Sequence, residues 1–233
     1  MTHETKRTKL ELEKVIFIGR TYEEYIDMFV LSEADLKDKK ILDCPSGACS
    51  FTATGHTKGL NITAADIVYD FSADDLYAKG QEDLQHAMTH MEKAKDNYRW
   101  QYFTDISHLH EHREKALLTC TQDMQENPDR YIPVELPVLP FDDQAFDILV
   151  SAHFLFTYAD RLDFQFHLDT LNELLRVTKE EIRLFPLIDL EGKRYEHLDR
   201  LIDYLQNKGY QVTEMKVPYE FQKGANAILR IVK

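Results

Sequence analysis

Three acidic residues stand where the chain could bind a ligand, because each ends or follows an apolar, strand-like run. Asp43 follows Ile41 and Leu42, Asp66 ends a second run, and Glu135 ends a third. An acid at the end of a second strand can accept hydrogen bonds from both hydroxyls of a ribose. Taken singly, Asp43 could equally cap a helix and Asp66 could close a turn. Their order at successive strand ends favours a common ligand site.

The turn after the first of these acids is short and made of small residues. The stretch Pro45-Ser46-Gly47 leads from a strand into residues that can start a helix. Such a turn presents backbone N–H groups, which suit a polar or anionic ligand. Only one of the three glycines of the usual dinucleotide-binding pattern is present, because Gly47 stands alone. The turn therefore indicates a ligand site only together with the acids.

Apolar runs elsewhere in the chain could form the strands that position these residues. Helical stretches lie between the runs, and this alternation predicts an α/β fold with a Rossmann-like, mostly parallel, seven-stranded sheet and helices on both faces. The predicted helices include residues 48–58, 162–177 and 195–208, and Gly209 follows the last of them as a terminator. The strand-like runs are KKILDC, NITAADI, RYIPVEL, AFDILVSAHF, EIRLFPLI, YQVTEMKV and AILRIVK.

The segment between residues 70 and 129 is too long for a simple crossover, which needs about a dozen residues or a little more. We predict two long helices in it, over about residues 74–99 and 108–125. Only one of them is required as a crossover. The other belongs to a helical insertion, which we place at residues 71–107.

Histidine and cysteine could bind a metal, but their spacing does not favour it. The pairs His86/His90 and His108/His112 each share a helix face, yet no glutamate stands in the arrangement of a metalloprotease helix. A solvated or partly buried helix face is therefore preferred, and no metal is expected. The three cysteines cannot all pair and lack zinc-like partners, so we expect buried free thiols.

The composition limits the partners that this chain can have. It has 233 residues, 43% of them hydrophobic, which suits a single domain over residues 1–233. The formal net charge of -13 opposes tight binding to nucleic acid or to an anionic membrane, because both need clustered Lys and Arg. No apolar run could cross a bilayer, and the N-terminus lacks the apolar core of a signal peptide. We expect a soluble, cytoplasmic protein with a small-molecule substrate.

Several segments together resemble the class I S-adenosylmethionine-dependent methyltransferases, especially the small-molecule, type 11-like branch related to quinone-biosynthesis enzymes. The resemblance runs from about Lys40 to the C-terminus and is interrupted by the insertion. Its most specific part is LPFDDQAFD, residues 139–147, with an acid four residues before it. The matching segments are ILDCPSGACSF for the first motif, AADI for the second, VELPVLPFDDQAFDILVSAHFLF for the third and fourth, and LNELLRVTKEEIRLFPL for the helix and fifth strand.

The resemblance implies S-adenosylmethionine as the cofactor. Asp43, with the backbone of the turn, would lie near the amino acid part of the cofactor. Asp66 would bind the ribose hydroxyls, and as an expected surface residue it should add little to stability. Glu135 and Leu136 would face the adenine. The residues that the resemblance assigns to the cofactor are Asp43, Ser46, Gly47, Asp66, Glu135, Leu136 and Ser151.

The acceptor side of the site is less defined by the resemblance. Ser151 and His153, past the fourth strand, would line the methyl-transfer pocket. No catalytic residue is compelled, because alignment of donor and acceptor dominates this chemistry. His153 and Tyr158 are the candidates for a base, and we expect both mainly to bind the acceptor. His153 alone could equally be a packing residue.

The N-terminal residues 1–38 are predicted to form a helical lid segment. Tyr22, Tyr25 and Phe29 share one helix face just before the first strand, where they could close over a ligand and contact the substrate. The alternative is that these rings simply pack on the sheet domain.

The implied function is methyl transfer to a small molecule that the sequence does not identify. No Asn/Asp-Pro-Pro-Tyr tetrapeptide follows the fourth strand, where SAHF stands, so methylation of nucleic-acid amino groups is not expected. Two alternatives stay open. One is an S-adenosylmethionine-binding protein without turnover, which the turn Pro45-Ser46-Gly47 permits, and the other is a nicotinamide-dependent oxidoreductase.

Overall fold

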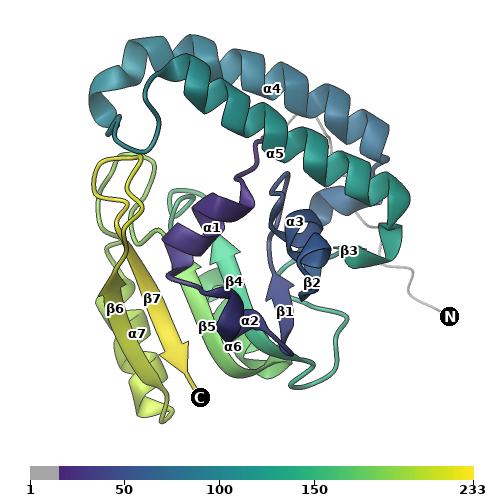
Figure 1. Ribbon diagram of the computed structural model, residues 1–233. Coiled ribbons are helices and arrows are strands. Elements are labelled where there is room, and N and C mark those ends of the chain that lie inside the picture. Colours follow the sequence, from purple (N-terminus) through teal and green to yellow (C-terminus); the bar gives the residue numbers. More distant parts are fainter. Residues whose placement is uncertain (1–15) are drawn as a thin grey trace, which may run out of the picture.

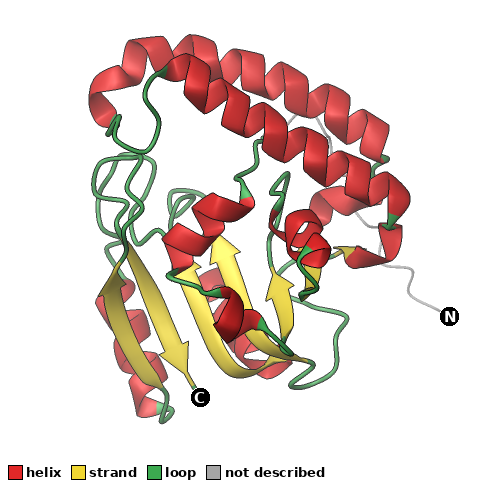
Figure 2. Cartoon of the chain, viewed as in Figure 1, coloured by secondary structure: helices red, strands yellow, loops and turns green. Residues whose placement is uncertain are grey.

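A seven-stranded sheet forms the centre of the protein in the computed structural model, which describes residues 16–233 (Figures 1 and 2). The strand order is β3-β2-β1-β4-β5-β7-β6. The pairs from β3 to β5 are parallel, whereas β7 is antiparallel to both of its neighbours. The predicted mostly parallel sheet is confirmed. The strands are β1 Lys40–Asp43, β2 Asn61–Asp66, β3 Tyr131–Pro133, β4 Phe146–Ala152, β5 Thr178–Phe185, β6 Gln211–Lys216 and β7 Ala227–Val232.

Helices cover both faces of the sheet, as predicted. One face packs against the helices α1 and α3, and the opposite face packs against α6 and α7. The helices are α1 Tyr22–Phe29, α2 Glu33–Leu36, α3 Phe51–Thr57, α4 Ala73–Ala94, α5 Ile106–Glu126, α6 Phe164–Val177 and α7 Leu198–Asn207. Short 3-10 helices are η2 Ile67–Asp70, η3 Lys95–Asn97 and η4 Pro128–Arg130.

Both long helices predicted after the second strand are present, as α4 and α5. They run antiparallel across the edge at which the parallel strands end (Figure 1). Gln125 Nε2 donates to Asp74 Oδ1 at 2.5 Å, which joins the end of α5 to the start of α4. At the other end, Arg99 Nε donates to Glu220 Oε1 at 2.8 Å and ties the α4–α5 connection to the β6–β7 connection. We call α4 and α5 together the roof.

The first described helix is fixed by a capping box. Thr21 accepts a hydrogen bond from the Glu24 backbone N–H, and Glu24 accepts one from the Thr21 backbone N–H at 2.9 Å. This start orients α1 so that Tyr25 and Phe29 are fully buried against the sheet. The lid segment predicted for residues 1–38 includes residues 1–15, which lie outside the described residues.

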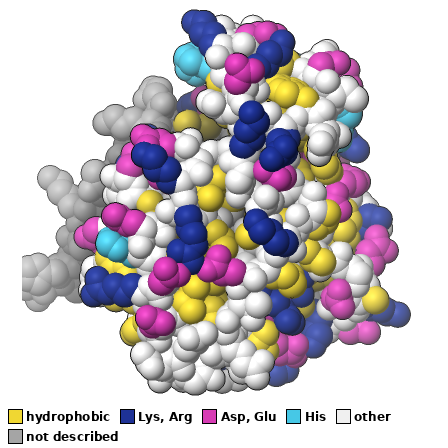
Figure 3. All heavy atoms as spheres, turned by 90° about the vertical axis from the view of Figure 1, so that its left-hand side faces the viewer, with side chains coloured by type: hydrophobic (Ala, Val, Ile, Leu, Met, Phe, Trp, Pro, Cys, Tyr) yellow, Lys and Arg dark blue, Asp and Glu magenta, His cyan; other side chains and the backbone are white. Residues whose placement is uncertain are grey.

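All three cysteines are buried and form no disulfide, as predicted. Among residues 16–233, no helix is long and apolar enough to span a bilayer. On the face that carries β6, β7 and α7, Lys and Arg side chains alternate with Asp and Glu (Figure 3). That face therefore presents no continuous basic surface of the kind that binds nucleic acid.

Candidate ligand site at the carboxyl edge of the sheet

The sheet contains one topological switch point, between β1 and β4. From β1 the chain continues to β2 on one side, whereas β4 pairs with β1 on the other side. In open α/β sheets, ligands bind in the crevice at the carboxyl ends of the strands at such a point. Asp43 ends β1, and Cys44 N donates to Val150 O at 3.0 Å, so the segments that leave both strands begin side by side.

Asp43 is fully buried at this point. Its carboxyl group accepts hydrogen bonds from Ser46 Oγ at 2.6 Å and from the Tyr25 hydroxyl at 3.2 Å. Burial, with a smaller contribution from the Asp66 carboxylate, raises the pKa of Asp43 to about 8. Asp43 is therefore largely protonated at neutral pH, and a cationic ligand group beside it would displace its proton.

Gly47, next to Ser46 in the turn, binds the second acid through its backbone. It adopts a left-handed φ of 56°, which favours glycine. Its N–H donates to Asp66 Oδ2 at 2.8 Å, and its carbonyl accepts from the Tyr69 hydroxyl at 2.7 Å. A Cβ at Gly47 would meet only Asp66 Oδ2, at 3.9 Å, so the backbone there leaves room for another group.

The expectation that Asp66 is a surface residue is wrong. Its exposed fraction is only 8%. Its Oδ1 accepts a hydrogen bond from the Val68 N–H at 3.1 Å, and its Oδ2 accepts the one from the Gly47 N–H. Burial raises the pKa of Asp66, and the hydrogen bonds from the backbone oppose that rise. Each carboxylate oxygen keeps one further lone pair, so both could still accept ribose hydroxyls. Asp66 also holds the turn together, so its loss must affect stability.

The predicted adenine contacts lie beyond the end of β3. That strand ends at Pro133, two positions before Glu135, so the predicted end of this strand is wrong. Val134 N donates to the Asp66 backbone carbonyl at 3.2 Å, which keeps the segment beside β2. Glu135 is exposed, and Leu136 is half-buried against neighbouring apolar residues.

The end of β4 carries a buried serine and a strained histidine. Ser151 is buried within β4. His153, just past the strand, has a φ of 53°, and its N–H donates to Phe185 O at 2.7 Å. Its Nε2 is buried without a hydrogen-bond partner. Burial, then the charges of Arg20 and Arg113, lower the pKa of His153 well below its ordinary value, so the imidazole is neutral at pH 7.

Tyr158 lies further along the loop that follows β4. It is half-buried, and its ring neighbours are Phe154, at 6.5 Å between centroids, and the guanidinium of Arg161, at 5.5 Å. Both of these neighbours belong to the same loop as Tyr158. The geometry therefore favours His153 over Tyr158 as a residue of the switch point.

The N-terminal segment before α1 crosses directly over the turn that follows β1. A Cβ at Gly19 would lie 1.9 Å from Ala48 O, so only glycine permits this approach. Arg20 N donates to Cys49 Sγ at 3.2 Å, and the Ser50 N–H donates to Arg20 O at 3.0 Å. Sequence reasoning did not find Arg20, because nothing in the local pattern separates it from a surface arginine.

The two tyrosines predicted for the lid pack against α3. The rings of Tyr22 and Tyr25 stack on Phe51, with centroids 5.5 and 4.8 Å away. Both rings are buried, which matches the packing alternative. Tyr25 also contributes to the site, because its hydroxyl reaches Asp43.

A buried ion pair joins the roof to α1 and was not predicted. Arg113 Nη1 in α5 donates to Glu24 Oε2 at 2.6 Å, and the Tyr219 hydroxyl donates to Glu24 Oε1 at 2.8 Å. The side chains of Arg113 and Glu24 are 5% and 0% exposed. Burial would raise the pKa of Glu24, but the charge and hydrogen bond of Arg113 outweigh it and lower that pKa. The capping box Thr21-x-x-Glu24 was readable in the sequence, whereas its distant partners were not.

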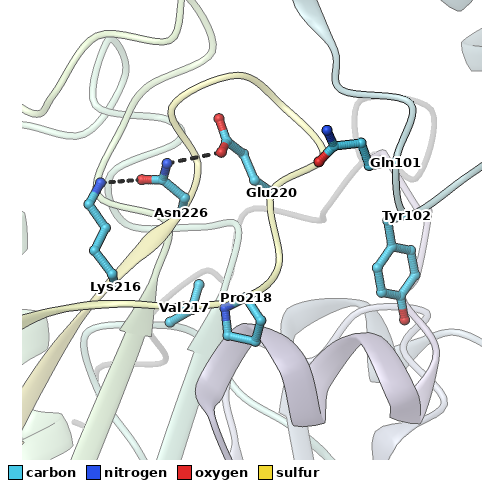
Figure 4. A pocket seen from close by; sticks show the side chains of 7 residues that line it. All are labelled: Gln101, Tyr102, Lys216, Val217, Pro218, Glu220 and Asn226. Atoms are coloured by element: carbon cyan, nitrogen blue, oxygen red, sulfur yellow. Dashed lines mark hydrogen bonds between the residues drawn. The ribbon is translucent and has the colours of Figure 1, made fainter.

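A groove of about 300 Å³ lies at one end of the same edge, between the α4–α5 connection and the end of β6 (Figure 4). Lys216 donates to Asn226, and Asn226 donates in turn to Glu220, as the dashed lines show. The ring of Tyr102 lies 5.0 Å from that of Tyr219, which belongs to the buried network. The groove is lined by Gln101, Tyr102, Lys216, Val217, Pro218, Glu220 and Asn226, none of which was a predicted site residue.

The histidine pairs stay within their helices. His108 and His112 bring their Nε2 atoms to 3.0 Å, and the rings of His86 and His90 lie 4.1 Å apart. Across residues 16–233, no group of three or more His, Cys, Asp or Glu is arranged to hold a metal ion.

Comparison with known proteins gives a relative without a known function. No protein-family model matches the chain. An uncharacterized protein of Methanocaldococcus jannaschii, MJ0045, is 38% identical over 223 residues, which cover 95% of this chain and 98% of the relative.

Solved structures match with low sequence identity. Magnesium protoporphyrin IX methyltransferase (ChlM) from Synechocystis PCC 6803, with bound S-adenosylhomocysteine, is 13% identical, with a TM-score of 0.51 over 90% of this chain and 80% of that one. A SAM-dependent methyltransferase from Aquifex aeolicus is 16% identical, with a TM-score of 0.46 over 90% of this chain and 91% of that one. The first of these shows the fold that the two chains share.

Proposed function

We propose that this chain transfers a methyl group from S-adenosylmethionine to a small molecule. It belongs to the family of the Methanocaldococcus jannaschii protein MJ0045. It has the fold of the class I S-adenosylmethionine-dependent methyltransferases. The observation that carries this proposal is the pair Asp43 and Asp66 at the switch point, which bind the adjacent turn residues Ser46 and Gly47 respectively. The acceptor is the part of the function that is not identified.

The residues at the switch point fit this cofactor. The ribose hydroxyls need an acceptor at the end of β2, and Asp66 has a free lone pair on each oxygen. The cofactor's ammonium group needs a carboxyl group that is not already paired with a Lys or Arg side chain. Among residues 16–233, Asp43 has no ion-pair partner, and its hydrogen bonds come from the hydroxyls of Tyr25 and Ser46. The bound cofactor would supply an electrophilic methyl carbon. The protein would then have to align the acceptor and exclude water, which the roof favours.

The raised pKa of Asp43 predicts that cofactor binding depends on pH. Below pH 8 the free protein holds a proton on Asp43, and an ammonium group beside it should release that proton. The affinity for S-adenosylhomocysteine should therefore rise with pH between pH 6 and 8, by at most about tenfold per unit, and level off above. Calorimetry in phosphate and in Tris buffer, which differ in ionisation enthalpy, should detect close to one proton released at pH 7.

The matched variant for this measurement is Asp43→Asn. It keeps the size of the side chain but has no proton to release, so any remaining binding should be independent of pH over the same range. A wild type that binds with no proton release and a flat pH profile would show that Asp43 does not meet the ammonium group.

The N-terminal segment and the roof are proposed as a cover that opens for ligand exchange. Gly19 lies against Ala48, and Cys120 of α5 contacts the Gly47 carbonyl, so both segments lie over the turn after β1. A ligand that binds beneath them should favour the closed state. With S-adenosylhomocysteine at 100 times its Kd, limited proteolysis within residues 16–30 and 72–100 should slow by up to about 100-fold. Cleavage near the exposed Lys193, between β5 and α7, should continue at its original rate. Equal cleavage of the cover with and without ligand would argue against opening.

Turnover can be tested without knowing the acceptor. Methyl-labelled S-adenosylmethionine, incubated with the protein and the small-molecule fraction of a cell extract, should yield a labelled small molecule and S-adenosylhomocysteine. Binding of the cofactor without any labelled product would favour the alternative of a binding protein without turnover.

The three unpaired thiols fit a reducing compartment, and we propose the cytoplasm as the location.

A further inference from the structure

Two buried nitrogen atoms beside the switch point have no hydrogen-bond partner. They are Nε of Arg20 and Nε2 of His153. Arg20 is fixed to the turn after β1 through Cys49 and Ser50, and His153 directly follows β4, the strand next to β1. Buried polar groups are nearly always paired, so two unpaired groups at neighbouring strand ends indicate a missing partner.

Within residues 16–233, Arg20 has no acid to which it is hydrogen-bonded. The nearby Glu24 carboxylate, whose pKa the charge of Arg20 helps to lower, is already paired with Arg113, and Asp43 is largely protonated at neutral pH. The Arg20 guanidinium donates one hydrogen bond, from Nη1 to Ile18 O at 2.9 Å, and has no acid partner in the described part of the chain. A partner that accepts hydrogen bonds and carries negative charge would satisfy it, and a carboxylate matches the planar guanidinium with two parallel bonds.

The backbone at His153 supports a functional role for its side chain. A left-handed φ at a residue other than glycine is strained and persists where the surroundings impose it. The hydrogen bond from His153 N to Phe185 O imposes it here, and the rings of His153 and Phe185 lie 5.2 Å apart. This conformation holds the imidazole at the carboxyl edge of β4.

We propose that Arg20 and His153 form a binding site for a carboxylate group of the methyl acceptor, so that the substrate class is an acidic small molecule. The assignment rests on the proposed function, because the acceptor must approach the cofactor at this switch point. The guanidinium would bind the carboxylate, and the neutral imidazole would hydrogen-bond to the same group or to the atom next to it. The cofactor also carries a carboxylate, and the experiment separates the two sources.

The test uses benzoate as the carboxylate probe and benzamide as its neutral counterpart. Both are titrated into the S-adenosylhomocysteine-loaded protein, with binding measured by calorimetry and by the NMR shift of the His153 imidazole. Benzoate should bind at least tenfold more tightly than benzamide, and Arg20→Gln should lose that preference. His153→Asn tolerates the left-handed φ and should weaken benzoate binding. Arg200→Gln, at an exposed arginine of α7, is the matched control and should behave as the wild type.

Several results would overturn the assignment. These are equal binding of benzoate and benzamide, no binding of either, and a response of Arg20→Gln that matches the wild type. Arg20→Gln could instead lose tenfold or more in affinity for S-adenosylhomocysteine while its affinity for 5′-methylthioadenosine stays unchanged. That result would show that Arg20 binds the carboxylate of the cofactor and not that of the acceptor. If Arg20→Gln does not fold, Arg20→Lys keeps the charge but cannot form two parallel bonds to a carboxylate, so it should bind benzoate more weakly than the wild type does, and undiminished benzoate affinity in it would contradict the proposal. Titrating benzoate without S-adenosylhomocysteine tests this site even if the protein fails to bind the cofactor, so the two failures are distinguishable.

Discussion

Replacing Asp66 by alanine is expected to weaken binding of S-adenosylhomocysteine by roughly 30-fold to 1000-fold, which corresponds to about 2 to 4 kcal/mol. In the proposed complex the charged acceptor of two ribose hydroxyls would be lost, and both donors would be left unpaired in a buried site. The same change also leaves the N–H groups of Gly47 and Val68 without their partners. The free energy of unfolding should therefore fall by about 2 to 4 kcal/mol as well. Calorimetric titration and denaturant unfolding measure the two effects separately.

Two further variants separate the binding effect from the structural one. Asp66→Asn keeps one carbonyl acceptor, so it should recover part of the stability while binding the ligand more weakly than the wild type does. Asp70→Ala removes an exposed acid at the end of η2 and should change neither quantity. An Asp66→Ala protein that is folded and binds S-adenosylhomocysteine as the wild type does would remove Asp66 from the site.

Replacing Arg113 by methionine should lower the free energy of unfolding by about 3 to 5 kcal/mol, because the carboxylate of Glu24 would be left buried without its cation. Tyr219 and the Thr21 N–H would still donate to Glu24, but neither carries a positive charge. The loss should be greatest in the contact between α1 and the roof. Denaturant unfolding gives the magnitude, and hydrogen exchange in α5 gives the location.

A double variant tests whether the unpaired charge is the cause. In Glu24→Gln with Arg113→Met no buried charge remains, so much of the lost stability should return. Lys193→Met, in the exposed pair with Glu191, is the control and should change stability by less than about 1 kcal/mol. If Arg113→Met costs less than the control, the ion pair does not hold the roof.

The sheet could be predicted from the sequence because its strands are short apolar runs separated by helices. Each strand had a local signal, and the two long helices after Asp66 followed from a gap too long for one crossover. The order of the strands placed Asp43 and Asp66 at neighbouring ends. Those parts of the candidate site depend on local sequence and on the common topology of such sheets.

The rest of the site depends on contacts between distant segments. Arg113 meets Glu24 across 89 positions, and Tyr219 meets Glu24 across 195, so no local pattern could pair them. The burial of Asp66 was missed for a related reason, because Tyr69 and α5 cover the turn after β1. The strained backbone of His153 follows from its neighbours in space and not from its type.

The central claim is that the carboxyl edge of this sheet binds S-adenosylmethionine. Calorimetric titration of the wild-type protein with S-adenosylhomocysteine, and separately with a nicotinamide dinucleotide, tests it most directly. We predict saturable binding of one S-adenosylhomocysteine per chain and no response to the dinucleotide. A wild type that is folded and ignores S-adenosylhomocysteine, or that binds the nicotinamide dinucleotide in its place, would contradict the claim.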